Sequence, residues 1–177
     1  MLSRSETMVS RIIGAMTSDP YTHVSIAFEK ELSPMYSFAR LGKYPLPGGL
    51  RLEYADKGYY RAHNQIPCAL YALEVEDEAY DIAKEMVTGM FKKRDKYTYN
   101  VLGLMLCKLN IAYARPYHFF CSEFVSMVLE QSKAVELPKP ASLMRPTDYT
   151  KVNGLKLLFK GKMFELAKFC SKARAAT

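Results

Sequence analysis

The chain has 177 residues, 49% of them apolar, and a formal net charge of +7. This length predicts a single domain over residues 1–177 that can bury a core without disulfides or metals. No apolar run approaches the roughly 18–20 residues of a membrane-spanning helix. The first ten residues also lack the continuous apolar region of a signal peptide. Composition therefore argues against membrane-spanning, collagen-like, coiled-coil and repeat proteins.

The positive charge is concentrated near the C-terminus. From Lys133 onward there are ten Lys and Arg against three Asp and Glu, whereas the rest of the chain has fifteen of each kind. This basic C-terminal segment, from about residue 150, has two interpretations: a solvated face, or a weak contact with an anionic membrane surface. No nucleic-acid-binding motif accompanies the charge, so we expect no nucleic-acid partner.

The cysteines and histidines form no metal-binding pattern. None of the cysteines lies in a Cys-x-x-Cys pair, and the three histidines are scattered. Without an export signal, this usage predicts reduced thiols, a cytoplasmic location and no metal site. The cysteines are Cys68, Cys107, Cys121 and Cys170, and the histidines are His23, His63 and His118.

The first half of the chain predicts one helix and several strands. An apolar stripe at helical spacing favours a helix over residues 5–16, and Asp19-Pro20 ends it. Residues 22–28 alternate as a strand, and residues 35–38 add a second strand, so the two predict an antiparallel hairpin. Further strands are expected over residues 50–54 and 68–75.

The second half is mainly helical. Apolar spacings of one and three predict a helix over residues 76–93, a second over about 100–109 and a third beginning near Cys121. Residues 155–173 contain a final strand or helix. Strands and helices that do not alternate regularly predict an α+β fold, with a small antiparallel sheet or barrel packed against helices.

Cys121 lies where an aromatic, strand-like run gives way to a helical stripe. The first turn of a helix offers free N–H groups and a partial positive charge, which favour a thiolate. A backbone amide there can also stabilise an oxyanion. The alternative is an inert core cysteine, because Cys121 shares the apolar stripe with Val125 and Val128.

A cysteine nucleophile needs a base, and His23 is the best placed histidine. It begins a strand directly after a Pro-Tyr-Thr run, at a strand end where active-site side chains often project. A structural role in the strand is the alternative. His118 fits an aromatic cluster better, and His63 lies in a polar loop.

Two segments together resemble a known superfamily. Residues 22–28 (THVSIAF) followed much later by residues 120–125 (FCSEFV) resemble the circularly permuted NlpC-type, papain-like proteins of the YiiX/YaeF-like kind. In that branch the histidine strand precedes the cysteine helix, as it does here. Residues 144–149 resemble the Pro-x-Asp element of the same proteins. Residues 36–40 resemble a hairpin strand of one uncharacterised bacterial subgroup.

The resemblance implies a cysteine hydrolase or acyltransferase with a permuted papain-like fold. Cys121 would attack an amide or ester carbonyl and form a thioester, with His23 as the general base. The third member is open between Glu53, whose carboxylate can accept the imidazole N–H, and Ser37 on the partner strand. A surface ion pair is the alternative for Glu53.

Substrate contacts are expected from Ser37, Arg40 and Tyr117. Arg40 has donors only, so it would bind a substrate carboxylate or phosphate, or else be solvated. Tyr117 would donate to the oxyanion, or else pack against its neighbours. Relatives often carry an apolar strand before the first helix, whereas this sequence begins almost at that helix, so either the strand is missing or the sequence starts late.

Three functions remain open at this point. The first is a hydrolase acting on a small amide or ester, with cell-wall-derived peptide fragments as the family-level substrate. The second is a lipid-directed acyltransferase of the lecithin:retinol type, favoured by the basic and partly apolar residues 155–174. The third is a binding domain that keeps the fold without catalysis. None of them implies a cofactor.

Overall fold

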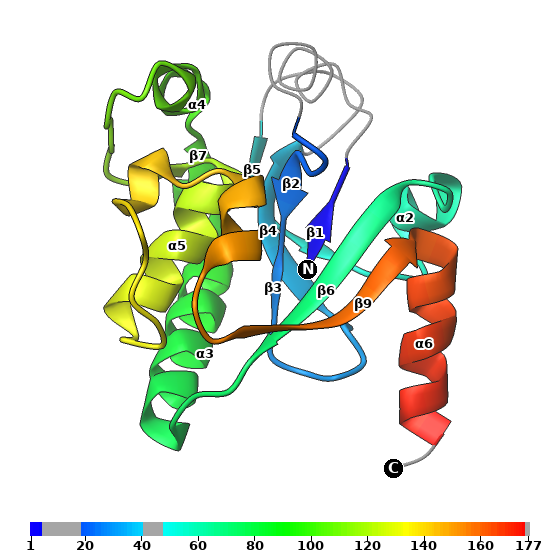
Figure 1. Cartoon of the computed structure of the whole chain (residues 1–177). Coiled ribbons are helices and arrows are strands. Elements are labelled where there is room, and N and C mark those ends of the chain that lie inside the picture. Colours follow the sequence, from blue (N-terminus) through cyan, green and yellow to red (C-terminus); the bar gives the residue numbers. More distant parts are fainter. Residues whose placement is uncertain (5–18, 41–47, 176–177) are drawn as a thin grey trace.

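The computed structural model describes residues 1–4, 19–40 and 48–175, in an α+β arrangement of small sheets and helices (Figure 1). The helix expected over residues 5–16 lies outside the described residues. The strands are β1 (Leu2–Ser3), β2 (His23–Val24), β3 (Ile26–Ala27), β4 (Met35–Arg40), β5 (Gly48–Glu53), β6 (Pro67–Leu73), β7 (Thr98–Tyr99), β8 (His118–Phe119) and β9 (Leu155–Lys162). The helices are α2 (Gly58–Ala62), α3 (Asp77–Lys92), α4 (Val101–Lys108), α5 (Cys121–Gln131) and α6 (Met163–Ala175), with 3-10 turns η1 (Arg94–Lys96), η2 (Ala141–Leu143) and η3 (Pro146–Lys151).

The larger sheet has the strand order β2-β1-β6-β9, and each of its pairs is antiparallel. β1 lies inside this sheet, with Leu2 opposite Val24 on one side and Ala69 on the other. A strand therefore precedes the segment for which the first helix was predicted, which answers a question that the sequence left open. Two residues were too short a run to show an alternating pattern in the sequence.

The second sheet confirms the predicted hairpin. β3 pairs with β4, and β4 pairs with β5 over six residues, all antiparallel. The predicted strand over residues 22–28 is divided at Ser25, so β2 belongs to the first sheet and β3 to the second. The two described sheets remain open and close into no barrel, which removes the barrel alternative.

The main core fills the space between the sheets and helices α3 and α5. Alternation along β4 places Tyr36 and Phe38 on one face, and both pack on rings from the helical side. Phe38 is fully buried, with its ring centroid 5.1 Å from Phe124 of α5 and 5.4 Å from Phe119. Aromatic contacts of this kind fix how α5 lies against β4.

A smaller core lies under the C-terminal elements. β9 is an edge strand of the larger sheet and leads directly into α6, so residues 155–173 contain both a strand and a helix. Met163, Leu166 and Cys170 recur at spacings of three and four and turn one face of α6 inward against Cys68 and Leu70. None of the described helices is long and apolar enough to cross a membrane.

We expect Phe38→Ala to lower the free energy of unfolding by about 3–5 kcal/mol, because it empties a fully enclosed aromatic site. Phe169→Ala, on the half-exposed face of α6, is the matched control and should cost about 1 kcal/mol or less. Urea denaturation followed by circular dichroism measures both. Equal losses in the two variants would contradict the placement of the main core.

Candidate functional site

Cys121 is the first residue of α5, as its sequence context predicted. The preceding residue, Phe120, has extended backbone angles, and the apolar stripe begins immediately after it. The Cys121 side chain thus lies in the first helical turn, beside backbone N–H groups that have no partner within the helix. Only 3% of the residue is exposed.

The first turn of α5 is held by a buried carboxylate. Glu123 accepts hydrogen bonds from the Phe120 backbone N–H and from the Asn100 side-chain amide, each at 3.3 Å. Burial raises the pKa of Glu123, and although these two donors lower it, the pKa rises to about 7. The side-chain carbonyl oxygen of Asn100 accepts a hydrogen bond from the Gly103 backbone N–H at 2.9 Å, so Asn100 also caps the N-terminus of α4.

His23 and Glu53 form the charged centre of the site. The His23 Nε2 atom lies 3.2 Å and 3.1 Å from the two carboxylate oxygens of Glu53. Both side chains are almost fully buried, at 11% and 12% exposure. Because β2 and β5 belong to different sheets, this contact bridges the gap between them.

The ion pair raises the pKa of His23 and lowers the pKa of Glu53. Burial alone would lower the pKa of His23, but the Glu53 charge and hydrogen bonds to Cys121 and Glu53 raise it to about 10. Burial alone would raise the pKa of Glu53, but the His23 charge and hydrogen bonds from His23 and Ser25 lower it to about 2. At neutral pH the pair is therefore an imidazolium and a carboxylate.

The Cys121 side chain interacts with His23 and helps to raise the pKa of the imidazole. The imidazole thus has a carboxylate partner in Glu53 and a sulfur neighbour in Cys121. The carboxylate, the imidazole and the thiol thus form a connected row. This is the order required for a base that is oriented by a carboxylate.

Hydroxyl groups complete the surroundings of this row. Ser25, at the break between β2 and β3, donates to Glu53 at 2.6 Å, and the Tyr60 hydroxyl lies 3.4 Å from the same oxygen. On the other side, the Tyr149 hydroxyl donates to the Ser122 carbonyl at 2.9 Å and lies 2.6 Å from the Ser126 hydroxyl. Tyr149, the last residue of the segment 144–149 that the sequence singled out, therefore holds the first turns of α5.

Sequence reasoning missed Tyr99. Its buried hydroxyl interacts with the side chain and the backbone of Cys121, and burial together with the charge of Cys121 raises the pKa of Tyr99. β7 and β8 pair in parallel, with Tyr99 opposite Phe119, and this pairing brings Tyr99 beside the start of α5. A Cβ atom on Gly48 would lie 2.8 Å from the Tyr99 Cβ, so the glycine makes room for the tyrosine. The only sequence signal was the helix-capping Asn100 that follows it.

The three expected substrate contacts lie at different places. Ser37 is buried on β4, near enough to Glu53 to lower its pKa, but its hydroxyl makes no hydrogen bond of normal geometry. Tyr117 has a φ of 62°, is 56% exposed and packs its ring on Tyr97. The Arg40 backbone pairs with Gly48, and its side chain lies outside the described residues.

The remaining cysteines are core residues, as their apolar surroundings suggested. Burial raises the pKa of the Cys68 thiol to about 12 and also raises the pKa values of Cys107 and Cys170. All four cysteines are free thiols. His118 bonds through Nδ1 to the Pro116 carbonyl. In the described part of the chain no group of three His, Cys, Asp or Glu side chains could hold a metal ion.

A cavity of about 710 Å³ runs along β5, close to the row of catalytic candidates. It is lined on one side by residues 48–52 and on the other by Phe91, Arg94, Asp95, Tyr97 and Thr98. Arg51 and Arg94 give it two cationic groups against one acidic group. Cys121 and His23 are absent from this lining, so the cavity borders the site without containing it.

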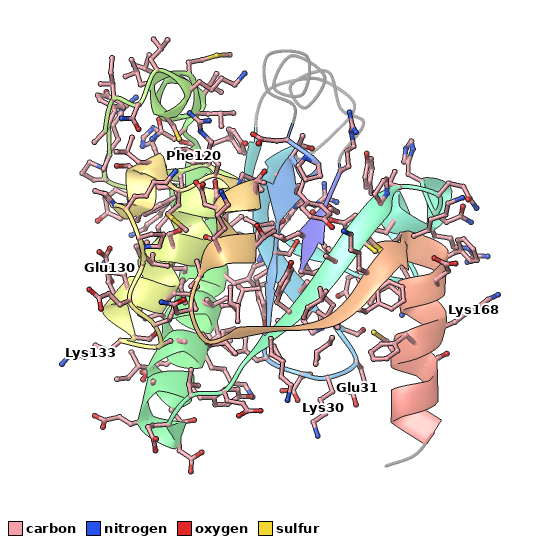
Figure 2. All side chains as sticks on the ribbon, viewed as in Figure 1. Lys30, Glu31, Phe120, Glu130, Lys133 and Lys168 are labelled. Atoms are coloured by element: carbon pink, nitrogen blue, oxygen red, sulfur yellow. The ribbon has the colours of Figure 1, made fainter. Side chains whose placement is uncertain are left out.

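Comparisons with models of known protein families, with curated proteins and with solved structures find no match to this chain. The geometry and chemistry of its own residues therefore carry the functional argument. Figure 2 shows the side chains on the ribbon and labels Phe120 at the end of α5 where the site lies.

We expect Glu53→Gln to lower the free energy of unfolding by about 3 kcal/mol or more at pH 5–6, because it leaves a buried imidazolium without its carboxylate. The contribution of His23 to the free energy of unfolding is fully present below the ordinary histidine pKa of 6.5 and is lost as the pH rises towards 10. The Glu53 contribution is present above 4.5 and is lost as the pH falls towards 2.

The difference between wild type and Glu53→Gln should accordingly shrink at pH 9 and at pH 3. Glu29→Gln, which removes an exposed ion pair with Lys84, is the control and should cost about 1 kcal/mol or less. Chemical denaturation across the pH range measures both variants. A difference that does not change with pH would argue against the buried ion pair.

Proposed function

We propose that this protein is a cysteine hydrolase or acyltransferase that attacks an amide or ester carbonyl through Cys121. The observation that carries the proposal is the row Glu53–His23–Cys121, with the cysteine at the first residue of a helix. The resemblance of residues 22–28 and 120–125 to permuted NlpC-type proteins supports the same chemistry. That superfamily, with its papain-like fold, remains part of the proposal.

In the proposed mechanism the thiol proton rests on His23, which Glu53 keeps charged. The Cys121 sulfur forms a bond to the carbonyl carbon, and the carbonyl π electrons move to the oxygen. When the tetrahedral intermediate collapses, the bond to the amine or alcohol breaks and His23 protonates the leaving group. His23 then takes a proton from water, or from an acceptor alcohol or amine, as that nucleophile attacks the thioester. Collapse of this second tetrahedral intermediate breaks the carbon–sulfur bond, releases the acid, ester or amide product, and restores the Cys121 thiolate beside the protonated His23.

The oxyanion in this mechanism is stabilised by the Cys121 backbone N–H and the Tyr99 hydroxyl. Both donors lie at one place, because the Tyr99 hydroxyl interacts with the Cys121 backbone. Donors fixed before the reaction give the largest part of such stabilisation. Tyr99 thus takes the role that the sequence suggested for Tyr117.

The substrate class follows from the same proposal. A small amide or ester fits the reaction, and cell-wall-derived peptide fragments are the expectation from the resemblance. Arg51 and Arg94 of the neighbouring cavity suit a carboxylate on such a fragment. A cytoplasmic, reducing location, which belongs to the proposal, would keep Cys121 ready for reaction.

The first test is the rate of iodoacetamide labelling at each cysteine, followed by peptide mapping. Near pH 6.5 we expect Cys121 to label about tenfold or more faster than the other three cysteines, whose raised pKa values leave them protonated. His23→Ala should abolish this difference. His118→Ala, three residues from Cys121, is the matched control and should leave it unchanged.

Slow labelling of Cys121 in the folded protein, equal to that of Cys107, would contradict the nucleophile assignment. The chain would then be better described as a binding domain. Rapid labelling that survives His23→Ala would keep the reactive cysteine but reject His23 as its partner.

A second test separates the role of Tyr99 from that of the thiol. Tyr99→Phe should reduce acylation of Cys121 by a p-nitrophenyl ester about 10²–10³-fold, because one oxyanion donor is lost. Iodoacetamide reacts without an oxyanion, so its rate should change far less. Tyr97→Phe is the control for loss of a nearby hydroxyl. Equal loss of both reactions would assign Tyr99 to holding the thiol.

A further inference from the structure

Five of the nine exposed large apolar side chains of the described residues lie on α4 and the segment that follows it. We name this area the α4 surface and define it by the exposed side chains of Leu102, Met105, Leu109, Ile111 and Tyr117. Leu109 and Ile111 are 68% and 50% exposed, which is unusual for two large aliphatic side chains so close together. Exposed patches of this kind mark interaction sites more often than scattered single residues do.

Both the inner and the outer face of α4 carry apolar side chains. Packing in the core explains those of the inner face but not those of the outer face. Leu104 and Cys107 face inward and form a small cluster with Phe120. Leu102, Met105 and Leu109, at spacings of three and four, share the opposite face. A helix that is apolar all round is normally covered on every side, whereas here the outer face is open.

The segment that carries this surface has charges of one sign, and Asp148, an acidic side chain close to it from another segment, is paired with Lys139. Between Asp95 and Glu123 the sequence has no acidic residue, but it has Lys96, Lys108 and Arg115. Apolar and aromatic side chains interleaved with cations are typical of elements that rest in the interface of an anionic bilayer. This composition disfavours a basic partner and complements anionic headgroups.

The α4 surface is held rigidly. The Arg145 guanidinium donates to the carbonyls of Cys107 and Lys108 at 3.4 and 3.2 Å, and so fastens the C-terminal end of α4. Asn100 caps the other end. The exposed leucines are therefore presented by a fixed helix and need not be ordered when they meet a partner.

The surface also lies at the end of the molecule where the site is. In Figure 1, α4 is at the upper left, above the end of α5 that begins with Cys121. Phe120, which packs on the inner face of α4, is the residue directly before Cys121. An object that contacts the α4 surface would thus lie close to the nucleophile.

We propose that the α4 surface docks on an anionic lipid bilayer. This inference goes beyond the chemistry proposed for Cys121 and does not depend on it. Leu109, Ile111 and Tyr117 enter the headgroup region, while Lys108 and Arg115 contact lipid phosphates or carboxylates.

The basic C-terminal segment is the competing surface. Leu157 and Leu158 are 48% and 47% exposed on β9, between Lys156 and Lys160. Lysines on an edge strand also serve to prevent pairing with other chains, which gives these residues a sufficient role. In Figure 1, α6, into which β9 leads, stands on the opposite side of the molecule from α4.

The experiment is co-sedimentation of the full chain with phosphatidylcholine vesicles that contain about 30 mol% phosphatidylserine, against phosphatidylcholine alone. Wild type should bind the anionic vesicles, with weaker binding at high salt. Leu109→Asp with Ile111→Asp should lose about tenfold or more in affinity. Leu157→Asp with Leu158→Asp, on β9, is the matched control and should keep wild-type binding.

No binding of wild type at low salt would overturn the inference. So would loss of binding only in the β9 variant, which would assign the contact to the C-terminal segment. A wild-type dimer that becomes monomeric in the α4 variant, without vesicle binding, would assign the surface to a second copy. Circular dichroism checks that both variants fold.

Cys121 labelling separates this inference from the proposed function. An α4 variant that loses vesicle binding but labels normally supports two independent features. Vesicle binding without rapid labelling would reject the cysteine chemistry and leave the surface intact. Rapid labelling without vesicle binding would reject the docking surface and leave the cysteine chemistry intact.

Discussion

The contact between His23 and Glu53 constrains most of the structure around it. Two opposite charges removed from water cost several kcal/mol unless they meet each other and further hydrogen-bond donors. Ser25 and Tyr60 supply hydroxyls to Glu53, and the Cys121 side chain meets the imidazole. Since His23 and Glu53 come from different sheets, their pairing sets how β2 and β5 lie relative to one another.

A second set of contacts holds Cys121, the proposed nucleophile, near that pair. Glu123 and Asn100 fix the start of α5 from one side, and Tyr149 fixes it from the other. These side chains are buried and polar, so each would be costly if its partner moved. A reactive group supported in this way keeps its position without help from substrate, which is the condition for preorganised catalysis.

Local pattern predicted much of this arrangement, and long-range pairing accounts for what it missed. The alternation of residues 22–28 and 35–38 predicted the hairpin, and the stripe after Phe120 placed Cys121 at a helix start. Glu53 was a candidate because a carboxylate suits an imidazole, and in the structure it contacts His23. Ser37, the other candidate, is buried, and its hydroxyl has no hydrogen-bond partner of normal geometry among the described residues. Tyr99 and β1 could not be found, because each depends on a two-residue strand whose partner is remote in sequence.

The wide separation of the site residues along the chain has a consequence for how the protein reaches its native state. His23, Glu53 and Cys121 are separated by 30 and 68 residues, and they meet only after two sheets and a helix have packed together. Contacts so distant along the chain form late, because loop closure must precede them. A nascent or partly unfolded chain would therefore carry an ordinary thiol, and reactivity would arise together with the completed tertiary structure.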